Sequence, residues 1–163
     1  IPITSIIGKK EIMQNGVKSF ISSTFWTESV GPAAAISTLQ EMNNKQSWIK
    51  ISKIGKRIKN FWKYLSRKYD VQISIEGIDA LPSFKFKSNM HLYYKTFLTQ
   101  EMLKKKILAT NAVYCCIYHE KYFHLYFKEL EKIFSRISKF IKGENIMKSL
   151  NYPVSQPGFS RLN

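Results

Sequence analysis

The chain has 163 residues, of which 44% are hydrophobic and 14% aromatic, a composition that supports a buried core and argues against intrinsic disorder. Its formal net charge of +15 raises the question of nucleic-acid binding, but the lysines are spread along the chain, as on ordinary solvated faces. No apolar run approaches the ~18 residues that a membrane span needs, which argues against a membrane partner. The two cysteines, Cys115 and Cys116, are neighbours, a poor geometry for a disulfide, so we expect a reducing, cytoplasmic compartment.

The first part of the chain predicts short elements followed by a helix. These are a buried strand over 1–7, a helical turn over 11–15, an extended segment over 17–27 and a helix over 29–42. Ile36 and Leu39 are expected on the apolar face of that helix. A hydroxyl-rich loop, Ser22-Ser23-Thr24, stands ahead of it, and hydroxyls with free backbone N–H groups at a helix entrance suit an anion such as phosphate.

The clearest helical period runs over 45–69. Its apolar residues recur at steps of three and four: Trp48, Ile51, Ile54, Ile58, Phe61, Trp62 and Leu65. Lysine and arginine occupy much of the remaining surface. Such a helix can bind nucleic acid, but more often it packs on a core with its basic face in water. We therefore predict a core helix and keep a basic α+β nucleic-acid-binding module as an alternative function.

After Asp70 the period changes from helical to alternating. The later elements are predicted as strands over 71–75 and 83–86, a helix over 96–106, an apolar strand over 112–118 and a helix over 121–142. Phe97, Met102 and Leu103 are expected on the apolar side of the 96–106 helix. The order predicts an α+β fold in which helices cover one face of a small, mainly antiparallel sheet.

Motifs for catalysis from this chain's own residues are missing from the sequence. It contains no P-loop, GxGxxG, HExxH, Cys/His metal spacing or GxSxG elbow. His91, His119 and His124 are isolated, so we interpret them as surface or packing residues and predict no metal site.

Several stretches nevertheless resemble one family of enzymes. The segment Ser22–Ala35 resembles the loop and helix start of class III pyridoxal-phosphate (PLP) aminotransferases of the glutamate-1-semialdehyde 2,1-aminomutase type. The opening Ile1–Met13 is similar to the stretch that follows the family's Schiff-base lysine. The stretches that match the family's C-terminal domain are Gly77–Phe84, Phe97–Leu103 and Gly158–Leu162. The resemblance covers nearly the whole chain.

The resemblance implies the C-terminal part of a fold-type I PLP enzyme, with 1–42 ending the large domain and 43–163 forming the small domain and tail. Such an enzyme, a transferase or an isomerase, moves an amino group on a small amino, keto or aldehyde substrate. The subgroup with a Phe-Trp-Thr-Glu loop is associated with sugar or surface-polysaccharide metabolism. In the family's homodimers, a loop threonine binds the cofactor phosphate of the neighbouring subunit. Thr24 corresponds to that threonine, and Ser23 is a nearby candidate.

The resemblance also places the Schiff-base lysine a few residues before Ile1, so no catalytic residue is expected in this chain and the isolated polypeptide is expected to be inactive. Two positions depart from the family pattern: Ser29 stands where related loops often carry arginine, and Cys115-Cys116 replaces a Val-Ser-like pair. A loop that only caps the helix, and an inactive gene fragment, remain as alternatives.

Overall fold

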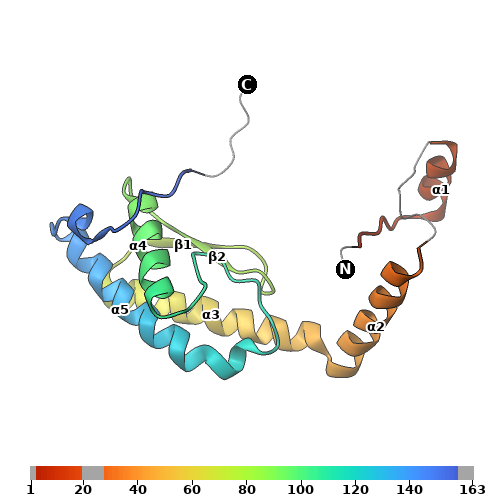
Figure 1. The fold of residues 1–163 in the computed structure, drawn as a ribbon, viewed down its shortest axis with the longest axis horizontal. Coiled ribbons are helices and arrows are strands. Elements are labelled where there is room, and N and C mark those ends of the chain that lie inside the picture. The colour runs from red at the N-terminus through yellow and green to blue at the C-terminus, as the bar shows by residue number, and fades with distance from the viewer. Residues whose placement is uncertain (1–2, 20–27, 158–163) are drawn as a thin grey trace. The chain divides into compact units, whose positions relative to one another are not determined.

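The computed structural model describes residues 3–19 and 28–157, and the chain divides into two compact units, Ile1–Ser47 (unit 1) and Trp48–Asn163 (unit 2) (Figure 1). The division falls a few residues beyond the predicted boundary at 42/43. The assignment of the two parts to the large and small domains of a PLP enzyme stays a prediction.

Unit 1 contains three described helical elements: α1 (Lys10–Met13), a 3₁₀ helix (Gln14–Lys18) and α2 (Val30–Lys45). The helical turn and the longer helix are therefore confirmed. The α2 helix continues three residues past its predicted end at 42 and is capped by Gln46, whose φ of 50° is left-handed. Such a residue stops the helical hydrogen-bond pattern.

Burial was predicted wrongly in unit 1. The residues expected to form a buried strand are exposed and not in a strand over 3–7, and Ile36 and Leu39 are 57% and 64% exposed. None of the described residues up to position 46 is buried. An apolar period marks a face that could be covered, but only a packed neighbour buries it. Most of the predicted extended segment 17–27 lies outside the described residues.

Unit 2 is built around one long helix and a small sheet. Its elements are α3 (Ser47–Tyr69), β1 (Ile73–Glu76), β2 (Ser83–Phe86), α4 (His91–Lys104), a 3₁₀ helix (His119–Tyr122), α5 (Phe123–Ile141) and a second 3₁₀ helix (Ile146–Ser149). The strands pair antiparallel with Ile75 opposite Phe84. Phe84 and Phe86 are buried and Lys85 between them is exposed, so the helices cover one face of the sheet, as predicted.

Aromatic side chains form the centre of this core. The ring of Phe84 lies 4.8 Å from that of Trp62, 5.2 Å from Phe86 and 6.0 Å from Phe134. The apolar stripe of α3 is confirmed for its central members Ile54, Ile58, Trp62 and Leu65, which are all buried. Trp48, at the start of the helix, is instead 45% exposed.

The segment 112–118 is not a strand, although it lies along β2. Only one bridge, between Ser83 and Ala112, is present, with hydrogen bonds from Phe84 N to Asn111 O and from Val113 N to Pro82 O. An antiparallel ladder needs the reverse bonds as well. Pro82 has no N–H to donate, and the side chain of Asn111 donates to Phe84 O at 2.8 Å. The ladder is therefore only half formed.

The two later helices were predicted with partial success. Phe97 and Met102 are buried in α4, but Leu103 is 49% exposed because it lies on the opposite side of the helix from the core. The α4 helix also begins at His91, ahead of the predicted residue 96. The last helix is confirmed, with its first turn wound as a 3₁₀ helix before α5.

Candidate functional site

The two predicted cofactor-binding residues, Thr24 and Ser23, lie outside the described residues. The structure does describe the helix that follows them. Ser29 precedes α2 and makes no capping hydrogen bond with its side chain. Backbone N–H groups in the first turn of a helix attract anions, and Ser29 does not occupy them with its hydroxyl. The first turn of α2 therefore has backbone N–H groups that an anion could bind.

We next ask whether a described lysine could act as a Schiff-base residue. Such an amine needs a site that favours its neutral form at neutral pH, and the described lysines are mostly exposed. Lys59 is the half-buried lysine of α3. Its Nζ donates to Gly77 O at 2.7 Å and pairs with Asp79 Oδ1 at 3.1 Å, so both contacts tie the amine to the turn. Lys59 therefore has a structural role in holding the turn between β1 and β2.

The turn between β1 and β2 also meets α3 at Gly55. A Cβ placed on Gly55 would lie 1.6 Å from the carbonyl oxygen of Asp79, so only glycine allows this approach. Gly77 in the same turn has a φ of 77°. Sequence reasoning missed the contact, although a lone glycine inside a strongly periodic helix is the signal that could have indicated it.

The basic face of α3 is partly neutralised by carboxylates of unit 2. Lys56 lies 3.8 Å from Asp79, Arg57 lies 3.8 Å from Glu120, and Lys68 lies 2.6 Å from Glu131. The hydrogen bond from Lys68 holds the pKa of the Glu131 carboxyl below its usual value. These pairs reduce the charge that the helix can offer to a polyanion.

The adjacent cysteines differ in environment. Cys115 is half-buried, with its Sγ 3.7 Å from Asp79 O, whereas Cys116 is exposed. Burial, followed by the charge of Asp79, raises the pKa of the Cys115 thiol to about 11. A thiol reacts as its thiolate, so the environment of Cys115 suits an inert packing residue, as its position in an apolar segment indicated.

We expect iodoacetamide at pH 8 to alkylate Cys116 first and Cys115 far more slowly. A pKa of about 11 rather than 9.0 lowers the thiolate fraction of Cys115 about a hundredfold at this pH. Between pH 9 and 11 the Cys115 thiol keeps its proton in the folded state and loses it in the unfolded state. The free energy of unfolding therefore falls as the pH rises through that window. Peptide mass spectrometry gives the two rates, and urea-unfolded chain is the control. Equal rates in the folded chain would contradict the burial of Cys115.

Histidines and acids do not gather into a metal site in the part of the chain that the structure describes, where no group of three His, Cys, Asp or Glu side chains could hold an ion. His119 instead accepts a hydrogen bond at Nδ1 from the backbone N–H of Cys116, at 3.3 Å. It lines a pocket of about 540 Å³ whose walls come from α3, α4, the loop 107–114 and the beginning of α5. This pocket was not predicted, because it is built largely from an irregular loop.

The fold is one found in a PLP-binding protein. Among solved structures, the chain is similar to the FumI protein of Sphingopyxis sp. MTA144 in its PLP internal aldimine form. The TM-score is 0.71 at 14% sequence identity, and the match covers 88% of this chain and 35% of that chain. At this identity the likeness shows the fold, and the chain spans about a third of the length of its neighbour. No family model and no curated protein matches the sequence.

Of the helices in the described ranges, none is both long and apolar enough to span a bilayer.

Proposed function

We propose that this chain is the C-terminal part of a PLP-dependent enzyme of the class III aminotransferase or aminomutase type. The observation that carries the proposal is the fold: 88% of this chain aligns with a protein whose structure was solved with PLP. The sequence resemblance to PLP enzymes supports the same proposal. The lack of buried residues among the described positions up to 46 agrees with a segment that packs against more protein.

When bound, PLP would supply an electron sink for the substrate bond that breaks. Thr24 would donate a hydrogen bond from its hydroxyl to the cofactor phosphate of the partner subunit in a homodimer, and Ser23 is a nearby candidate for the same role. The beginning of α2 adds backbone N–H groups to this anion site. Unit 2 contributes the small domain. The lysine that anchors PLP is supplied by sequence that precedes Ile1, and the substrate is a small amino, keto or aldehyde compound, with sugar-derived compounds among the candidates. We place this enzyme in the cytoplasm.

The test uses the protein translated from the reading frame extended upstream of Ile1, which should contain a lysine codon a few codons before it. In that protein, Thr24→Val should weaken PLP binding about tenfold, the loss expected for a hydrogen bond to a charged group. Equilibrium dialysis measures the affinity. Thr24→Ser should retain binding, and Thr38→Val in α2 is the control, because the Thr38 hydroxyl donates within the helix to Ala34 O.

The 163-residue chain alone should show no amino transfer under the same conditions. Turnover by that chain, a frame without the lysine codon, or an unchanged PLP affinity in Thr24→Val would each contradict the proposal. The nucleic-acid alternative predicts oligonucleotide binding that falls steeply with salt and is lost when Lys56 and Arg57 are neutralised. The ion pairs of these two residues with Asp79 and Glu120 count against it.

A further inference from the structure

The pocket of unit 2 has the size and composition of a site for a small molecule. Its volume is about 540 Å³, within the range of ligand pockets. Its floor and walls are mostly apolar: Ile58 from α3, Ile107, Ala109 and Val113 from the loop, and Phe123 from the beginning of α5. No Lys, Arg, Asp or Glu side chain is among its described lining residues. An ionised ligand would find no counter-charge there, so the pocket favours an uncharged one.

Two polar residues in the lining, Tyr126 and His119, each have a hydrogen that can be donated. The Tyr126 oxygen accepts from Trp62 Nε1 at 3.1 Å, which leaves the phenol proton for another acceptor. Burial raises the pKa of Tyr126, so the phenol keeps that proton at physiological pH. The hydrogen bond from Cys116 N–H to His119 Nδ1 assigns the ring N–H to Nε2, a second donor.

The hydroxyl protons of Thr99 and Thr110 already have acceptors within the protein. Thr99 Oγ1 donates to Thr110 Oγ1 at 3.4 Å, and Thr110 Oγ1 donates to Asn111 Oδ1 at 3.2 Å. Tyr126 and His119 are therefore the donors on which the proposal is built, and an acceptor such as a carbonyl oxygen matches them.

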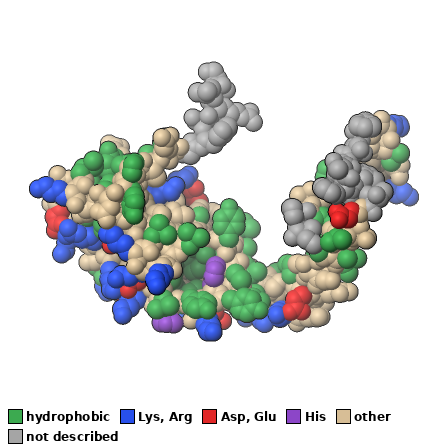
Figure 2. All heavy atoms as spheres, in the orientation of Figure 1, with side chains coloured by type: hydrophobic (Ala, Val, Ile, Leu, Met, Phe, Trp, Pro, Cys, Tyr) green, Lys and Arg blue, Asp and Glu red, His purple; other side chains and the backbone are tan. Residues whose placement is uncertain are grey.

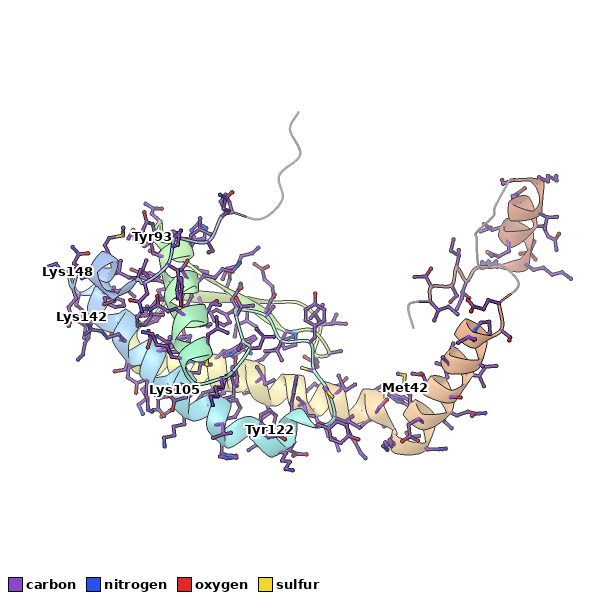
Figure 3. All side chains as sticks on the ribbon, in the orientation of Figure 1. Met42, Tyr93, Lys105, Tyr122, Lys142 and Lys148 are labelled. Carbon is purple, nitrogen blue, oxygen red and sulfur yellow. The ribbon has the colours of Figure 1, made fainter. Side chains whose placement is uncertain are left out.

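The mouth of the pocket is apolar and open. Leu108 is 93% exposed, Tyr114 80% and Tyr122 52%. Figure 2 shows apolar side chains lying open on unit 2, and Figure 3 places Tyr122 at the beginning of α5. Exposed aromatic and aliphatic side chains around a hollow are typical of a binding site, because a ligand removes them from water.

We propose that this pocket binds an uncharged aromatic ketone or aldehyde, with the rings among the apolar walls and the carbonyl oxygen accepting from Tyr126 and His119. Two aromatic rings fit within the volume of about 540 Å³. The proposal does not rest on the assignment of PLP, because every lining residue named belongs to unit 2.

The test uses benzophenone, an uncharged aromatic ketone, and diphenylmethane, which has the same rings without the carbonyl. Binding to the 163-residue chain is followed through the methyl NMR signals of Ile58, Ile107 and Val113. We expect benzophenone to bind about fivefold more tightly than diphenylmethane for each hydrogen bond made. Irradiation of bound benzophenone should attach it to peptides that contain 107–114 or 119–126.

Two variants separate the pocket from the rest of the surface. Tyr126→Phe should weaken benzophenone binding about fivefold and leave diphenylmethane unchanged, a difference that a general loss of packing would not produce. Ala109→Phe should weaken both compounds about tenfold, because its ring occupies the pocket. Tyr152→Phe and Ala33→Phe, at exposed positions, are the matched controls and should change neither affinity.

Photolabelling spread evenly over exposed tyrosines and leucines, equal affinity for the two compounds, or unchanged binding in Ala109→Phe would overturn the proposal. A failure here concerns the pocket of unit 2 alone, whereas a failure of the Thr24 test concerns the cofactor loop of unit 1. The two proposals can therefore be rejected separately.

Discussion

Replacing Phe84 with alanine is expected to lower the free energy of unfolding of unit 2 by about 4 kcal/mol. Phe84 is fully buried and its ring contacts Trp62, Phe86 and Phe134 across the sheet–helix interface. Alanine would remove these contacts and leave a cavity, because the backbone on both sides is held by strand pairing and by the hydrogen bond to Asn111 O. Urea unfolding followed by tryptophan fluorescence measures the change.

The matched control is Tyr152→Ala, at an aromatic residue that is 66% exposed, where we expect a change near zero. Phe84→Leu should lose less than Phe84→Ala, since leucine refills part of the cavity. A loss in Phe84→Ala no larger than that of the control would show that the core does not centre on this ring.

Gly55→Ala is expected to destabilise unit 2 by about 2 kcal/mol or more, although alanine is the better helix former. The gain in helix propensity is about 1 kcal/mol, whereas forcing a methyl group into a packed contact costs about 3 kcal/mol. The carbonyl of Asp79 stands 1.6 Å from the position of the new Cβ, and it is backbone that cannot rotate away. Thermal unfolding measures the effect.

Gly31→Ala in α2 is the control for the same substitution. There the nearest atom to the new Cβ is Ile3 Cδ1 at 3.4 Å, the end of a flexible side chain, so the variant should be neutral or slightly more stable. If Gly55→Ala proved as stable as Gly31→Ala, the close approach of α3 to the turn would be wrong.

The parts of the fold that could be predicted from the sequence were those with a strong period and a neighbour to pack on. The stripe through Ile58, Trp62 and Leu65 gave the core face of α3, and the alternation around Phe84 and Phe86 gave the antiparallel pair. Periodicity reports which side chains share a face, and unit 2 supplies the partner surface.

The predictions were wrong where a segment has an apolar pattern but lacks a suitable neighbour to pack on or pair with. Ile36 and Leu39 follow a helical period, but the described part of unit 1 offers nothing to cover them. The apolar run 112–118 looks like a strand, yet strand formation depends on donors in the neighbouring segment, and Pro82 removes one. A sequence pattern does not carry information about the hydrogen-bond partner on the next segment.

Of the two candidate sites, one was predicted from the sequence and the other was found only in the structure. Thr24 and Ser23 came from the resemblance and the loop chemistry, and they lie outside the described residues, so their role stays a prediction. The pocket beside Tyr126 could not be predicted, because its walls come from segments far apart in sequence and the Tyr126 hydroxyl accepts a hydrogen bond from the distant Trp62. The nearest signal in the sequence was the density of tyrosines over 114–126.

The unpaired edge of β1 bears on whether this chain can pair with strands of other chains. Within the described residues it pairs with β2 on one side only, so alternate backbone N–H and C=O groups of β1 point away from the sheet. An open edge of this kind can recruit a foreign strand and seed aggregation. Here the edge is four residues long and ends at the charged side chain of Glu76, which lies 2.9 Å from Lys85. Its shortness and its charge make β1 a poor template for such growth.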